Sequence, residues 1–162
     1  MANVVHSGLT AANLHEPKGV ASATTGKVYV SNGAGSGAWT TVGVGQSFAL
    51  TVQCADASSA TATSKDAYLT LPFACTVTNV YSVAFAAIAT ADNVITVSNH
   101  AGSSMGTITV AFTGSAIGDV DTITAITTNN TFAAGEKMSF VSASASATVC
   151  PMTYTVIATR TS

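Results

Sequence analysis

The chain has 162 residues, enough for one ordinary domain or for a domain of about 100 to 120 residues with an arm. Only 7% of the residues are charged, against about 25% in typical soluble domains, so Ser, Thr, Asn and Gly must form most of the polar surface. The five Lys and Arg residues are scattered, which argues against nucleic-acid binding, and the most apolar run, 80–89, is about half the length of a membrane-spanning helix.

The formal net charge of −2 leaves little electrostatic repulsion between molecules. We therefore expect much of the surface to be covered by copies of the chain or by another protein. A monomer kept soluble by Ser and Thr hydroxyls is the alternative. The first ten residues lack the basic start and apolar run of a secretory signal, so we do not expect export by the secretory route.

Composition shifts near residue 46, which predicts an arm at 1–45 and a β-domain at 46–162. The arm holds eight of the thirteen glycines. Within it, Lys27–Ser31 and Ala38–Val42 are expected to pair as a small β-hairpin, with the Gly-rich stretch between them as the loop. A two-stranded ribbon of this size is marginal alone, so it needs a surface to lie against.

From Gln46 onward, apolar residues alternate with polar ones at the period of two that indicates half-buried strands. Turn-forming stretches separate the runs every ten to fifteen residues or so, and no capped helix is evident. The pattern predicts an all-β antiparallel sandwich, jelly-roll-like, behind the arm. The expected inward residues are Val77, Tyr81, Val83 and Phe85; Ile95 and Val97, or the opposite face with Val94; Ile108, Val110 and Phe112; Met138 and Phe140; and Tyr154, Val156 and Ala158.

Three cysteines, Cys54, Cys75 and Cys150, have no paired spacing of the C-x-x-C kind that zinc sites use. We expect them to be small buried apolar residues. A Cys54–Cys75 bridge remains possible, although the missing signal argues for a reducing compartment.

Candidate sites for metal or catalysis are weak. His6, His15 and Glu16 can ligate zinc, but their spacing is uninformative and no fourth ligand is evident. His100 lacks the nucleophile signature that catalysis would need, so a loop histidine is the better interpretation. The glycines of 33–38 match no phosphate-binding motif and precede a strand rather than a helix.

Asp119 and Asp121 alternate along a strand or turn and can point the same way. Paired acids hydrolyse glycosides or bind calcium. No further acid lies nearby, so solvated turn acids or an interface contact explain them more simply. We expect no enzymatic activity, no cofactor and no metal.

The stretch from His6 to Trp39 resembles the N-terminal attachment module of tailed-bacteriophage virion proteins, particularly head fibres and decoration (cement) proteins. The positions that carry the match are Leu9, Thr10, Leu14, His15, Glu16, Pro17, Lys18, Gly19, Val28, Tyr29, Val30, Asn32, Gly33, Gly35, Gly37 and Trp39. The remainder resembles the β-sandwich domain of phage decoration proteins through Pro72 with Phe73, Thr76 to Val80, Gly118 to Asp121, and Ala134 to Glu136.

This resemblance implies a structural virion protein on the outer surface of the capsid, made in the host cytoplasm. It would stabilise the shell as a trimer by binding the major capsid protein. The implied docking residues are Leu9, Thr10, Leu14, His15, Glu16, Pro17, Lys18, Tyr29 and Trp39. Two alternatives stay open: a tail-fibre module that binds a host glycan, and a polysaccharide-degrading enzyme that uses Asp119 and Asp121.

Overall fold

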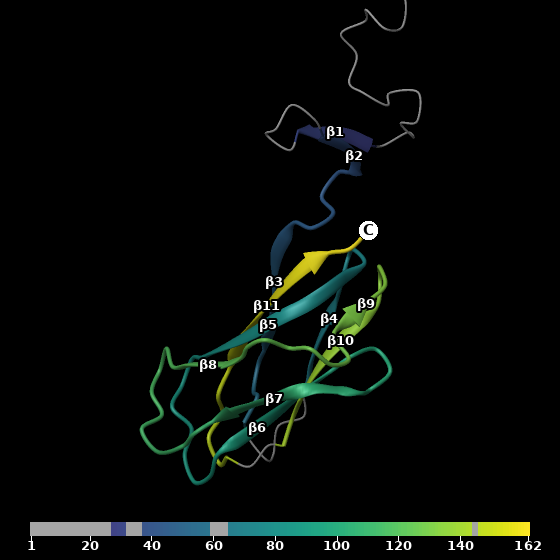
Figure 1. Ribbon diagram of the computed structural model, residues 1–162. Coiled ribbons are helices and arrows are strands. Elements are labelled where there is room, and N and C mark those ends of the chain that lie inside the picture. Colours follow the sequence, from purple (N-terminus) through teal and green to yellow (C-terminus); the bar gives the residue numbers. More distant parts are fainter. Residues whose placement is uncertain (1–26, 32–36, 59–64, 144–145) are drawn as a thin grey trace, which may run out of the picture. The chain divides into compact units, whose positions relative to one another are not determined.

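The computed structural model describes residues 27–31, 37–58, 65–143 and 146–162 (Figure 1). Over these ranges the chain forms β-strands and no helix, which confirms the predicted all-β class. The chain divides into two compact units, Met1–Val42 and Gly43–Ser162, close to the boundary expected near residue 46. The strands are β1 (Lys27–Ser31), β2 (Gly37–Thr41), β3 (Ser47–Cys54), β4 (Ala67–Thr70), β5 (Cys75–Ala84), β6 (Asn93–Ser98), β7 (Ser104–Val110), β8 (Val120–Ile123), β9 (Thr131–Phe132), β10 (Lys137–Ser142) and β11 (Met152–Arg160).

In the first unit, β1 and β2 pair antiparallel as the predicted hairpin. Gly37 opens β2 opposite Ser31. A Cβ atom on Gly37 would collide with the carbonyl oxygen of Val30, so only glycine lets the two strands approach this closely.

The second unit is an antiparallel β-sandwich, as predicted. One sheet has the order β3-β11-β5-β8, with β9 also pairing with β5, and the other has the order β4-β10-β6-β7. The two layers are visible in Figure 1. The chain crosses between the sheets repeatedly, since β3, β4, β5 and β6 alternate between them, and this gives the expected jelly-roll-like connectivity.

Alternating side chains from both sheets fill the core. Ile95 and Val97, not Val94, are the buried apolar residues of β6, and the predicted inward residues of β10 and β11 are buried as well. These confirmed core residues are Met138, Phe140, Tyr154, Val156 and Ala158.

The predicted inward face of β5 is wrong beyond Val77. The register between β5 and β11 shifts at Ile157, where a bulge inserts an extra residue into β5. One extra residue reverses the alternation. Val80, Ser82 and Ala84 therefore point inward, while Tyr81 and Val83 are half-buried on the outer face and Phe85 is 48% exposed.

Two further expectations differ at strand ends. β7 ends at Val110, so Phe112 lies beyond the strand and is 45% exposed rather than in the core. One of the turn-forming stretches, 114–121, ends within a strand, because Val120 and Asp121 pair with Val83 and Ser82 of β5 and begin β8.

All three cysteines are buried, as expected, and none of them forms a disulfide, so the possible Cys54–Cys75 bridge is not present. Burial raises the pKa of each thiol. They are therefore uncharged, unreactive parts of the core.

Candidate docking surfaces

The hairpin presents an aromatic pair on one face. Tyr29 and Trp39 are direct cross-strand partners, and their ring centroids lie 5.4 Å apart in an edge-to-face arrangement at 65°. Such pairs stabilise antiparallel strands and offer a large contact area. The indole Nε1–H of Trp39 has no hydrogen-bond acceptor among the described residues, so the hairpin alone does not satisfy its largest side chain.

The opposite face of the same hairpin is also apolar. Val28 is 43% exposed and Val30 is 51% exposed, and they pair with Thr40 and Ala38. A ribbon buries only one face when it lies on a sheet of its own protein. Apolar side chains on both faces suit a ribbon that inserts between surfaces of a partner.

Among the predicted docking residues, the structure therefore brings Tyr29 and Trp39 together. The other predicted docking residues lie outside the described part of the chain: Leu9, Thr10, Leu14, His15, Glu16, Pro17 and Lys18. The same holds for the candidate zinc ligand His6.

The outer surface of the β3-β11-β5-β8 sheet is a second candidate surface. It is built from short uncharged side chains that alternate with the core residues of each strand. The hydroxyls of Ser47 and Thr159 lie 3.4 Å apart across two strands, and that of Thr122 donates to the carbonyl of Val80. We call this surface the threonine face; its members are Ser47, Ala49, Thr51, Gln53, Thr76, Thr78, Tyr81, Val83, Val120, Thr122, Thr153, Thr155, Ile157 and Thr159.

The outer surface of the other sheet is different, because it carries a charge. The ammonium of Lys137 lies 5.3 Å from the centroid of the Tyr68 ring, and Tyr68 is 56% exposed. The two outer surfaces of the sandwich are thus chemically distinct. The sequence analysis did not predict the threonine face. Thr153 and Thr155, two positions apart in one strand, are the signal that could have indicated it.

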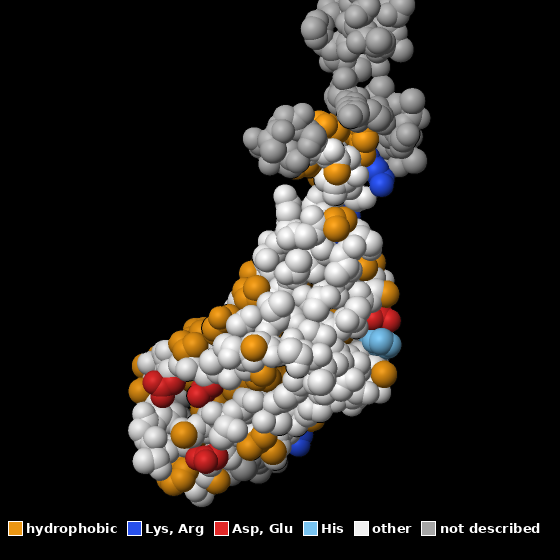
Figure 2. All heavy atoms as spheres, in the orientation of Figure 1, with side chains coloured by type: hydrophobic (Ala, Val, Ile, Leu, Met, Phe, Trp, Pro, Cys, Tyr) orange, Lys and Arg blue, Asp and Glu red, His pale blue; other side chains and the backbone are white. Residues whose placement is uncertain are grey.

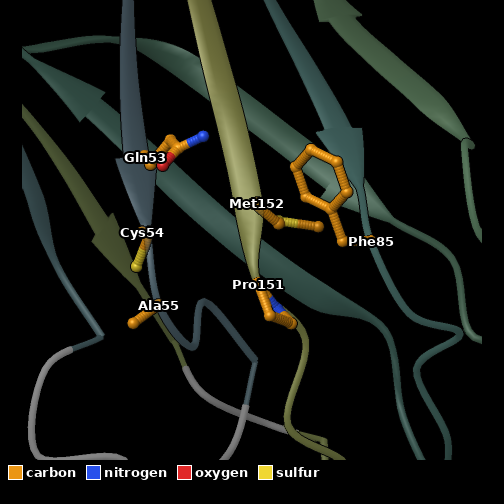
Figure 3. Close-up of a pocket in the computed structure, with 6 residues that line it drawn as sticks. All are labelled: Gln53, Cys54, Ala55, Phe85, Pro151 and Met152. Atoms are coloured by element: carbon orange, nitrogen blue, oxygen red, sulfur yellow. The ribbon is translucent and has the colours of Figure 1, made fainter.

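A pocket of ≈ 390 Å³ adjoins the threonine face where β3 and β5 end and β11 begins. Its lining includes Gln53, Phe85 and Pro151, and Figure 3 shows the side chain of Met152 directed toward the Phe85 ring. The lining has no charged group and one amide, so it fits an apolar side chain better than a polar ligand. The pocket is lined by Gln53, Cys54, Ala55, Phe85, Pro151 and Met152.

The acidic pair lies at the start of β8, where Asp119 precedes the strand and Asp121 is its second residue. Asp119 Oδ2 accepts a hydrogen bond of 2.6 Å from the backbone N–H of Ala116, which fixes the turn before β8. Asp121 lies opposite Ser82, on the side of β8 away from the threonine face. Burial, and secondarily the charge of Asp119, raise the pKa of Asp121. Both acids line a small polar pocket with the end of β7.

His100 lies in the turn after β6, as expected for a loop histidine. Its Nδ1 is 3.1 Å from Glu136 Oε2. The same carboxylate oxygen accepts the backbone N–H of Ala133 at 2.8 Å. The contact between His100 and Glu136 therefore connects the turn after β6 with the turn before β10, which is a structural role.

In the part of the chain that is described, no cluster of three or more His, Cys, Asp or Glu side chains is placed to hold a metal ion. No described helix is long and apolar enough to cross a membrane.

Comparison with known proteins identifies no family for the chain. No protein-family model matches the chain, and no curated protein matches it. A solved structure with a similar arrangement is the carbohydrate-binding module CsCBM6-3 from Clostridium stercorarium, in complex with cellobiose. It is 15% identical, with a TM-score of 0.34, over 86% of this chain and 85% of that one. A likeness this low says nothing about a ligand of the present chain.

Proposed function

We propose that the chain is a capsid decoration protein of a tailed bacteriophage. Its hairpin unit docks on the major capsid protein at the outer surface of the head, and the protein acts as a trimer. The observation that supports this most is the hairpin itself, which forms with apolar side chains on both faces in a unit distinct from the sandwich.

The energetics of the hairpin favour a partner. Two strands joined by a loop are marginally stable in water. Burying the exposed parts of Val28 and Val30 together with the Tyr29 and Trp39 pair would gain about 25 cal/mol for each Å² of apolar area. A capsid surface that covers both faces would therefore order the hairpin and bind it in one step.

The sandwich surface fits a structural role. In the view of Figure 2, acidic and basic side chains form a few separate spots on a surface of uncharged polar and apolar atoms. A protein that binds only the assembled shell stabilises it by mass action. The proposal assigns the chain no reaction and no cofactor.

The decisive experiment locates the chain in the virion. Immunogold labelling of intact virions with antibodies against residues 46–162 is expected to mark heads. Labelling of tails would support the alternative of a tail-fibre or host-glycan-binding module instead. Absence of the chain from purified virions would overturn both.

A matched pair of variants tests the docking surface. Trp39→Ala in the full chain is expected to lower co-sedimentation with heads assembled without this protein by at least tenfold. Tyr68→Ala removes an aromatic side chain of comparable size that is 56% exposed on the sandwich, and it is expected to bind as the unmodified chain does. Equal binding by both variants would remove the hairpin from the interface.

A further inference from the structure

We infer that the threonine face is the contact between copies of this chain in the trimer, with three such faces turned toward a common threefold axis. This assignment rests on the trimer of the proposed function. It adds which surface makes the contact and how the neighbouring copies fit together.

The threonine face has no charged side chain, which suits a surface that packs around a symmetry axis. Around a symmetry axis, equivalent residues of the copies approach one another, so a charged group on that surface would meet its own like. The threonine face carries none. Asp121 points to the other side of β8, and Arg160 follows the inward alternation of β11 beyond Ala158. The outer surface of the opposite sheet, with Lys137, would bring ammonium groups together.

The width of the threonine face matches three copies around one axis. Four strands spaced by about 4.8 Å make a face about 19 Å wide, and three such faces in a triangle lie about 5.5 Å from the axis. Packed sheets lie about 10 Å apart, so each backbone is about 5 Å from the midplane between them. Side chains of ordinary size such as Thr155 and Tyr81 therefore fill the space that a trimer leaves. A ring of four copies would leave a wider channel.

The triangular arrangement also brings together two sheet edges that fit one another. The β3 edge of one copy meets the β8 edge of the next. At the β8 edge, Val120 is 60% exposed. The uncharged pocket begins at Gln53 on the β3 edge and extends past the start of β11 to Phe85. Gln53 and Val120 belong to one cross-strand row through Thr153 and Val83. In the trimer, Val120 of one copy therefore enters the Gln53 end of its neighbour's pocket.

Burial of the threonine face also costs little side-chain conformational entropy. Threonine and valine lose less rotamer freedom than lysine, glutamate or glutamine. Their hydroxyls can donate and accept, so they can exchange bonds with water for bonds across the interface.

The test is the mass of the full chain in solution at micromolar concentration, by native mass spectrometry and sedimentation. We expect a trimer that becomes a monomer in Thr155→Arg, because three guanidinium groups then meet at the axis. The control Thr109→Arg places the same charge on the exposed side of β7 in the other sheet and is expected to leave the trimer intact. A trimer in Thr155→Arg, or a monomer in the unmodified chain, would overturn the inference.

A second measurement does not depend on how Thr155→Arg folds. Gln53→Cys and Val120→Cys in one chain place thiols on the two edges, while the natural cysteines are buried. A short bismaleimide is expected to link copies into covalent trimers from the double variant only. Dimers alone, or no cross-links, would contradict the threefold arrangement. Since no capsid is present, a trimer that fails to bind heads would leave this inference standing and remove the proposed function.

Discussion

Phe140 of β10 and Tyr154 of β11 stack face to face across the sandwich, with ring centroids 4.4 Å apart and planes 9° from parallel. One ring comes from each sheet, and both are buried. The Tyr154 hydroxyl donates to the sulfur of Met152, which lies 3.8 Å away and is a weak acceptor. Burial raises the pKa of Tyr154 well above its usual value, so the phenol stays neutral.

Removal of one ring is expected to destabilise the sandwich strongly. Phe140→Ala should lower the free energy of unfolding by about 3 to 5 kcal/mol, because it leaves a cavity between the sheets. Urea unfolding followed by far-UV circular dichroism measures the change. Phe112→Ala is the control, since Phe112 is 45% exposed and lies outside the strands. A loss below about 1 kcal/mol in Phe140→Ala would mean that the stack does not hold the sheets together.

A buried polar contact next to this core should be equally sensitive. The Nδ2 of Asn93 donates to the carbonyl of Ala57 at 2.5 Å, and its Oδ1 lies 2.9 Å from the hydroxyl of Ser142. Asn93 is fully buried. These bonds join β6, β10 and the segment after β3, three parts far apart in sequence.

Asn93→Leu is therefore expected to cost about 2 to 3 kcal/mol, since it removes both buried hydrogen bonds of the Asn93 amide, to the carbonyl of Ala57 and to the hydroxyl of Ser142. Thermal unfolding and amide hydrogen exchange of Ala57 and its neighbours measure the effect. Asn99→Leu is the comparison, because the Asn99 side chain accepts two backbone hydrogen bonds in an exposed turn, where water can replace them. A melting temperature for Asn93→Leu equal to that of the unmodified chain would show that the Asn93 contact contributes nothing.

The fold class was predictable because alternation is a local property. Ile95, Val97, Phe140 and Val156 carry the period of two in their own strands, and each is buried as expected. The bulge in β5 was not predictable, since it depends on pairing with β11, seventy or more residues later. That pairing decides whether Tyr81 faces the core or the outer surface of the sheet.

One of the two candidate surfaces depends on local sequence, and the other depends on the pairing of strands far apart in the chain. The Tyr29 and Trp39 pair follows from the hairpin register, which joins two strands only a few residues apart in sequence. The threonine face needs strands from both ends of the domain, because β3 and β8 become edges of one sheet only after β11 and β5 pair between them. No stretch of sequence shows that a whole sheet surface lacks charge.

Trp39 is the one tryptophan of the chain and lies in the Met1–Val42 unit, so its fluorescence reports on the hairpin alone. We expect its emission to shift to long wavelength at lower urea concentration than the far-UV circular dichroism of the sandwich, because a two-stranded ribbon is marginal. Tyr29→Ala should move the fluorescence transition lower still and leave the dichroism transition in place. Coincident transitions in the free protein would instead indicate one cooperative unit.

Asp121 should make the protein less stable at neutral pH than at acid pH. Its pKa in the folded state is raised above the ordinary 3.8, first by burial and then by the charge of Asp119. The stabilisation that the neutral carboxyl gives is fully present below pH 3.8 and is lost as the pH rises through the folded pKa. Asp121→Asn keeps the shape and removes the charge, so it should raise the melting temperature at pH 7, and the gain should vanish below about pH 4. Asp119→Asn is the control, because it relieves the same repulsion but weakens the acceptor for the Ala116 N–H, so it should show a smaller gain or none. A lower melting temperature for Asp121→Asn at pH 7 would mean that the ionised carboxylate makes a favourable contact, as an acid with a binding or catalytic task would.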